Sequence, residues 1–120
     1  MQAVGEELGD ELTGADVVHY DWHPGNVLVE PAAPDRVVAV VDWAGAWAGH
    51  VAEDLASLVF ACALHAPELA PRAERALLDL ADERSLRLAW AHMALRLADW
   101  SIRHHPDNTD RVLAIANRHL

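Results

Sequence analysis

The sequence predicts an α+β fold that is mainly helical, with a small β-hairpin followed by three to four helices. Three observations carry this prediction. Valine-rich runs alternate with turn residues between positions 17 and 43, residues 51–65 are apolar nearly all round, and residues 83–103 carry an amphipathic stripe. We treat residues 1–120 as one domain, with the hairpin in 17–43 and the helical part in 51–120.

The β element is predicted from short valine-rich runs at residues 17–18, 27–29 and 37–41. Pro, Gly and Asp residues bound these runs, a pattern typical of strands joined by turns. The connection 30–35 contains two prolines, which we expect to keep it outside any hydrogen-bonded ladder. Residues 43–50 are rich in Ala and Gly and are expected to form a loop.

The central helix is predicted over residues 51–65, because a helix that is apolar on every side is a buried one. Pro71 suits the first turn of a second helix that runs to about residue 81. A third helix is expected over 83–103, with a core-facing stripe formed by Leu86, Trp90, Met93, Leu97 and Trp100. A short closing helix is expected around Val112, and a weak helical stripe occupies residues 2–13.

Composition excludes several classes of function. The formal charge is −10, so the chain would repel phosphate backbones and we expect no nucleic-acid partner. Nothing at the N-terminus resembles a signal peptide and no apolar run is long enough to span a membrane, which predicts a cytoplasmic protein without a membrane partner. All nine basic residues are arginines, and the single cysteine, Cys62, is expected to be a small buried side chain.

Polar residues gather at the ends of the valine-rich runs. Asp21 and Asn26 lie between the first two runs, and Asp42 directly follows the third. A hairpin would bring all three to one end of the ribbon. Asp21 can accept a proton from an attacking hydroxyl, while Asn26 and Asp42 offer the oxygen ligands that Mg²⁺ prefers. The pattern predicts phosphoryl transfer, which depends mainly on positioning and charge neutralisation.

These residues resemble the aminoglycoside phosphotransferase and choline kinase-like family, which is related to protein kinases. The resemblance lies in the spacing His19-x-Asp21-x-His23-Pro-Gly-Asn26 and in Asp42-Trp43 sixteen residues further on. Gly49 and the run Asp54-Leu-Ala also match the family pattern. The resemblance is dense over residues 17–60 and unspecific over 61–120.

The resemblance implies roles for individual residues. It makes Asp21 the catalytic base, and it makes Asn26 and Asp42 ligands of Mg²⁺. It also implies that His19 and Asp54 support the catalytic loop and that His23 lies near the phosphates. The implied reaction moves the γ-phosphoryl group of ATP or GTP to a hydroxyl of a small molecule.

The family binds its nucleotide between two lobes, and the first lobe supplies a lysine on a strand. This chain contains no lysine. It is therefore expected to correspond to the C-terminal lobe of a protein kinase-like fold, with the N-terminal lobe absent and the isolated chain incomplete. The expected partners are a nucleotide, a small-molecule acceptor, and either the missing lobe or a second copy of the chain.

Three alternatives remain open at this stage. His19, Asp21 and His23 alternate along the chain and could hold a transition metal in a hydrolase. The chain could instead be a non-catalytic interaction module derived from a kinase lobe. Trp22 and Trp47 flank the site, where they would form an aromatic surface for the acceptor or pack against the central helix.

Overall fold

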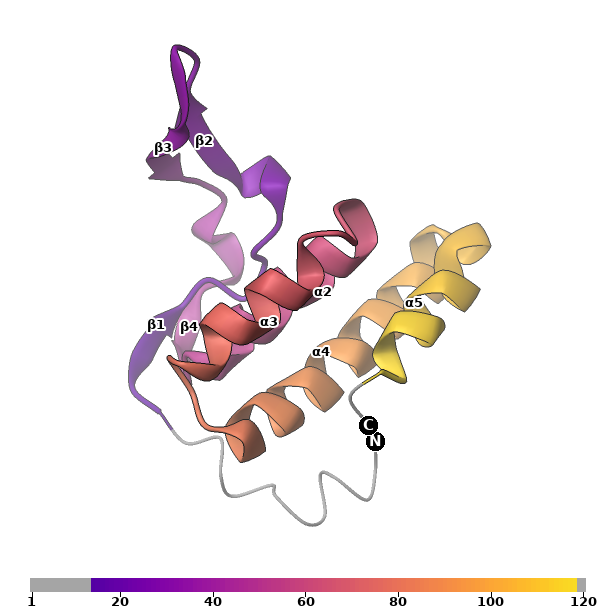
Figure 1. Ribbon diagram of the computed structural model, residues 1–120. Coiled ribbons are helices and arrows are strands. Elements are labelled where there is room, and N and C mark those ends of the chain that lie inside the picture. The colour runs from indigo at the N-terminus through magenta and orange to yellow at the C-terminus, as the bar shows by residue number, and fades with distance from the viewer. Residues whose placement is uncertain (1–13, 119–120) are drawn as a thin grey trace.

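The computed structural model describes residues 14–118, so the helical stripe expected over 2–13 lies outside the described residues. The described chain forms two small antiparallel sheets and a helical body (Figure 1). The strands are β1 (Asp16–Val18), β2 (Val27–Glu30), β3 (Ala33–Val40) and β4 (Trp47–Gly49). The helices are α2 (Ala52–His65), α3 (Ala70–Leu78), α4 (Glu83–His104) and α5 (Thr109–Ala116).

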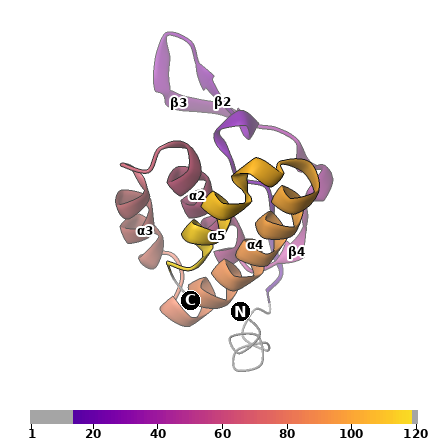
Figure 2. The ribbon, with the colours of Figure 1, turned by 90° about the vertical axis from the view of Figure 1, so that its right-hand side faces the viewer.

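This architecture confirms an α+β fold that is mainly helical. The predicted hairpin is β2 and β3, which project from the helical body in Figures 1 and 2. None of the helices between residues 14 and 118 combines the length and apolar character needed to cross a bilayer.

The expectation that residues 30–35 stay outside a ladder is wrong in part. Strand β3 begins at Ala33 and contains Pro34. Glu30 is paired with Ala33 and Val29 with Val37, so three extra residues of β3 lie between these two rungs. A proline cannot donate a ladder hydrogen bond, and it is tolerated here because the register is interrupted around it.

A second sheet replaces the loop expected over residues 43–50. After a 3₁₀ turn at Trp43–Gly45, β4 runs antiparallel to β1, with Val17 opposite Ala48. The pairing joins segments about 30 residues apart, and β4 is only three residues long. A strand this short, built from Trp, Ala and Gly, has too little periodicity for its sequence to reveal it.

The core lies between α2, α4 and α5. The Phe60 ring is fully buried and stacks on Trp90 of α4, with ring centroids 4.9 Å apart. The Trp90 indole Nε1 donates to the carbonyl of Ala116 at 2.9 Å, which ties α5 to α4. Met93 is also buried, so the central helix and most of the predicted stripe are confirmed.

Trp100 is the exception on that stripe. Its side chain is 47% exposed, and Ala98 and Ser101 supply the buried face at this end of α4. The Trp100 ring lies against the imidazoles of His104 and His105, at centroid distances of 5.6 and 4.8 Å. The prediction was wrong because the apolar spacing continues into the last turns of α4, where the described residues leave about half of the Trp100 side chain exposed.

Candidate active site

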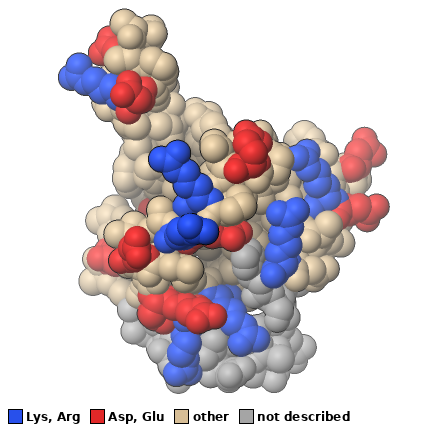
Figure 3. All heavy atoms as spheres, in the orientation of Figure 1, with Lys and Arg blue, Asp and Glu red and all other residues tan. Residues whose placement is uncertain are grey.

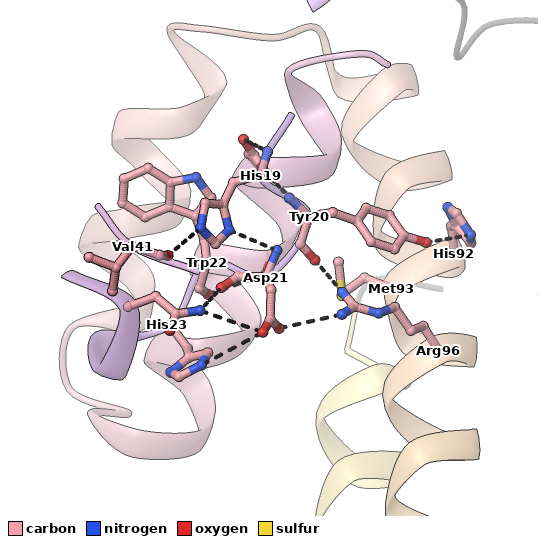
Figure 4. Close-up of polar contacts among 12 residues, drawn as sticks. His19, Tyr20, Asp21, Trp22, His23, Val41, His92, Met93 and Arg96 are labelled. Carbon is pink, nitrogen blue, oxygen red and sulfur yellow. Dashed lines mark hydrogen bonds and ion pairs between the residues drawn. The ribbon is translucent and has the colours of Figure 1, made fainter. Parts of the chain in front are cut away.

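The loop between β1 and β2 lies against the first turns of α2 and the middle of α4 (Figure 4). Asp54 of α2 holds the start of this loop. Its Oδ2 accepts from the amide of His19 at 2.9 Å, and its Oδ1 accepts from the amide of Tyr20 at 2.7 Å. One carboxylate therefore fixes two successive peptide units, and charge-assisted bonds of this kind are the stronger ones.

His19 connects the loop to the end of β3. Its side chain is fully buried, and Nδ1 accepts from the amide of Asp21 at 3.3 Å. Nε2 must then carry the proton of the neutral ring and donates to the carbonyl of Val41 at 2.8 Å. Both ring nitrogens are engaged within the protein, so His19 has no free nitrogen for the metal that the hydrolase alternative requires.

Asn26 joins the same group of residues from the other end of the loop. Its Nδ2 donates to the carbonyl of Asp21 at 2.9 Å and lies 3.5 Å from the Asp21 carboxylate. Its backbone carbonyl accepts from the amide of Val41 at 2.9 Å. Among residues 14–118, Oδ1 of Asn26 accepts no hydrogen bond, which leaves this oxygen available to a ligand.

Asp42 follows Val41 directly, and Val41 is held by His19 through its carbonyl and by Asn26 through its amide. The backbone of Asp42 is left-handed, with φ 63° and ψ 59°. Its side chain is exposed and makes no hydrogen bond or ion pair with the described part of the chain. The fold thus brings Asp21 and Asn26 into contact and places Asp42 next to the residue that both ends of the loop bind.

Arg96 of α4 also reaches Asp21, and sequence reasoning missed it. Its Nη2 lies 3.4 Å from Oδ1 of Asp21, Nη1 donates to the carbonyl of Tyr20, and the guanidinium lies 4.3 Å above the Tyr20 ring. One signal was present in the sequence, because Arg96 follows Met93 by three positions and therefore lies at the edge of the apolar stripe of α4. An arginine in that position needs a partner inside the fold.

A second missed set links Tyr20 to both helices. The Tyr20 hydroxyl lies 2.9 Å from Nε2 of His92, and Nδ1 of His92 lies 3.2 Å from the buried carboxylate of Glu53. Because Nδ1 of His92 donates to Glu53, Nε2 accepts a hydrogen bond from the Tyr20 hydroxyl. Burial raises the pKa of Tyr20, Arg96 opposes that shift, and Glu53 adds to it.

The remaining predicted residues lie around this group. His23 accepts from the amide of Gly25 through Nδ1 at 3.0 Å, and its Nε2 is 3.8 Å from the Asp21 carboxylate. The carbonyl of Trp22 accepts from Ser57 of α2 at 3.2 Å. Trp47 is 51% exposed and its ring lies 5.5 Å from that of Tyr20, so Trp47 is not buried against α2.

Two further features of the described residues bear on the location of the site. No group of three His, Cys, Asp or Glu side chains within 14–118 is arranged to hold a metal ion by itself. A cavity of about 560 Å³ lies between α2, α3 and α4, and its lining includes Val59, Leu77 and Trp90. None of its lining residues belongs to the loop 19–26, so this cavity is separate from the site.

Comparison with known proteins adds the decisive observation. A model of the phosphotransferase enzyme family matches residues 14–89, which is more than half of the chain. The chain belongs to the phosphotransferase enzyme family. The match contains every residue that the sequence analysis placed in the site, whereas His92 and Arg96 lie beyond it. No curated protein and no solved structure matches the chain.

Proposed function

We propose that this phosphotransferase chain moves the γ-phosphoryl group of ATP or GTP to a hydroxyl of a small molecule, as aminoglycoside phosphotransferases do. Membership of the family supports the reaction class. One structural observation carries the assignment of residues. Asn26 contacts Asp21 through its side chain and Val41 through its backbone, which draws the ends of the loop and of β3 together.

The donor set suits Mg²⁺. Oδ1 of Asn26 and the carboxylate of Asp42 have no partner among residues 14–118. A neutral amide oxygen and one carboxylate, completed by water and nucleotide phosphates, are the ligands this ion prefers. In the proposal Asn26 and Asp42 hold the ion, which when bound neutralises charge on the phosphates.

Asp21 acts on the acceptor. Its side chain is 46% exposed, so a hydroxyl can reach the carboxylate beside His23 and Arg96. In the proposed step Asp21 orients that hydroxyl and accepts its proton as the oxygen bonds to the γ-phosphorus. The bond between the γ-phosphorus and the bridging oxygen breaks, and the nucleoside diphosphate leaves. His19 and Asp54 hold the loop, and His23, Trp22 and Trp47 line the approach to it.

We further propose that a lysine-bearing N-terminal lobe contributes additional nucleotide contacts beside this chain, in keeping with a protein kinase-like C-terminal lobe. The absence of lysine supports this assignment. The β2–β3 hairpin offers a surface for such a lobe, because it projects from the helical body and Figure 3 shows its charged side chains gathered toward the tip. Its exposed apolar side chains are Leu28, Val29, Val37 and Val38, joined by Val41 just after β3.

The proposed roles are tested by substitution in the full chain. Asp42→Ala and Asn26→Ala should weaken binding of Mg²⁺ and nucleotide measured by calorimetry, because each removes one ligand oxygen. Asp21→Asn should leave that binding in place and lower phosphoryl transfer by about 10²- to 10⁴-fold, the usual contribution of a positioned acid–base group. Asp99→Asn, on the exposed face of α4, is the matched control. Unchanged binding in both ligand variants would show that the metal assignment is wrong.

The interaction-module alternative is favoured by the same exposed hairpin. If the chain pairs with itself through this ribbon, light scattering should give a mass that rises with concentration. Replacing Val37 and Val38 by Thr should then reduce association, since both side chains are more than half exposed at 57% and 54%. A monomer at all concentrations would exclude self-association through the hairpin.

A further inference from the structure

Tyr20 has an unusual backbone for a large aromatic residue. Its φ is 70°, and among residues 14–118 only Asp42 also combines a positive φ with a side chain. The left-handed region favours glycine, because a Cβ there approaches the following carbonyl. A bulky residue stays in this region only when its surroundings hold it.

The surroundings hold Tyr20 at every polar atom. Its amide donates to Asp54 at 2.7 Å, its carbonyl accepts from Arg96, and its hydroxyl pairs with His92 at 2.9 Å. Two of these partners, His92 and Arg96, come from successive turns of α4. Figure 4 shows Arg96 extending to the loop and the Tyr20 ring extending to His92. The Arg96 guanidinium also covers the ring at 4.3 Å.

The peptide unit between Tyr20 and Asp21 is fixed at both ends. Arg96 binds its carbonyl oxygen, and Nδ1 of His19 accepts from its N–H at 3.3 Å. The second guanidinium nitrogen, Nη2, lies 3.4 Å from the Asp21 carboxylate. Rotation of this peptide would break both bonds and move Asp21, so Arg96 restrains the direction of that carboxylate together with His19 and Asn26.

We propose that Arg96 is a positioning residue that holds Tyr20 in its left-handed conformation and thereby aims Asp21. The consequence for catalysis rests on the proposed function of Asp21, whereas the restraint on the loop does not. A lysine could not replace Arg96, because one ammonium cannot bind the carbonyl, reach the carboxylate and cover the ring in a fixed plane.

The test is amide hydrogen exchange of the full chain, read at His19 and Asp21 by NMR. Arg96→Gln should raise exchange at these two amides by about tenfold or more, as expected when strain of this size loses its support. Arg103→Gln removes an exposed arginine from the same helix, where it pairs with Asp99, and should leave the loop unchanged. Arg96→Lys serves as a milder variant if Arg96→Gln folds poorly, and it should also raise exchange at the loop.

A double-mutant cycle separates positioning from general support of the fold. Tyr20→Gly removes the backbone strain, so Arg96 should matter less in its presence. The amide exchange rates at His19 and Asp21 in the double variant Tyr20→Gly/Arg96→Gln should stay within about twofold of the rates in Tyr20→Gly alone. The proposal is overturned if Arg96→Gln and Arg103→Gln change the amide exchange rates of the loop equally. It is also overturned if the loop of Arg96→Lys exchanges as slowly as in the wild type, or if Tyr20→Gly does not reduce the effect of Arg96→Gln.

Phosphoryl transfer provides a second readout. Arg96→Gln should lower kcat while the KM for nucleotide stays within about twofold, because the restraint acts on the acceptor side of the site. Tyr20→Gly should restore part of that kcat. If the wild-type chain neither binds nucleotide nor transfers phosphate, the proposed function fails and the exchange result still decides the role of Arg96. If transfer falls without a change in loop exchange, Arg96 does not act by positioning.

Discussion

Asp54 illustrates how one side chain near the start of a helix can organise a loop that is distant in sequence. It lies in the first turn of α2, and both of its oxygens accept amides from residues more than thirty positions earlier. Each bond fixes a peptide next to Asp21, so the geometry of the candidate site depends on where α2 begins. The local sequence Asp-Leu-Ala carries no sign of this contact unless it is read together with the loop.

Tyr20 is the only tyrosine in the chain, so its ionisation can be followed by phenolate absorbance. Burial raises its pKa above the ordinary value of 10.0, and Arg96 opposes this effect. Arg96→Gln should therefore raise the pKa of Tyr20 further. Because its pKa is raised, Tyr20 holds its phenol proton more tightly in the folded state than in the unfolded state, so protonation of Tyr20 favours folding.

The contribution of Tyr20 to stability should be complete below the unfolded pKa and lost as pH rises through the folded pKa. Tyr20→Phe should remove this alkaline component from the pH dependence of unfolding. An absorbance titration with a midpoint at or below 10.0, unchanged in Arg96→Gln, would contradict the prediction.

The β1–β4 sheet depends on glycines at close approaches. A Cβ added to Gly49 would lie 2.5 Å from the carboxylate of Glu53 and 2.7 Å from the Val18 side chain. A Cβ on Gly14 would lie 2.4 Å from the carbonyl of Gly49. Because these glycines have no Cβ, the short sheet can pack directly against α2, whose Glu53 pairs with His92.

Gly49→Ala should therefore destabilise the fold by about 1–3 kcal/mol, the usual range for overpacking a tight position. Gly45→Ala is the matched control, because the nearest atom to its added Cβ is 4.0 Å away. The free energy of unfolding in urea measures both variants. Equal stability of the two variants would show that β4 can move away from α2 at little cost.

The whole molecule is held together by a core rich in alanine, with few large side chains. Among residues 14–118, ten of the twenty buried apolar residues are alanines, and Phe60, Trp90 and Met93 are the largest of the other ten. Small residues let α2 and α4 approach closely, so the large rings between them carry much of the buried apolar area.

Phe60→Ala should cost about 3–5 kcal/mol, because it removes a fully buried ring and leaves a cavity against Trp90. Trp100→Ala removes a larger ring that is 47% exposed and should cost much less. Thermal or urea unfolding compares the two. If Trp100→Ala lowered the free energy of unfolding more than Phe60→Ala does, the apolar stripe of α4 would be buried as far as Trp100.

The sequence by itself determined the helical part and the hairpin, because apolar periodicity and valine-rich runs act locally. It also determined which residues to examine in the loop 19–26 and after β3, since their spacing matched that of a phosphotransferase. Sheet β1–β4 depends on contacts between distant segments, and the exposure of Trp100 depends on what packs beside the end of α4, so no local pattern encodes either. The bulge around Pro34 lies within the β2–β3 hairpin, where the valine-rich runs predict strands but not their register.

Only the tertiary structure decided that α4 also holds the loop, because the sequence had pointed to His19 and Asp54 alone. Arg96 lies 75 positions after Asp21 and His92 lies 72 positions after Tyr20, yet both contacts form because α4 packs against α2 beside the loop. A long-range ion pair leaves at most a charged residue on an apolar stripe as its trace in the sequence. The physical reason is that packing of whole helices, set by many small apolar contacts, places these few polar atoms within reach of one another.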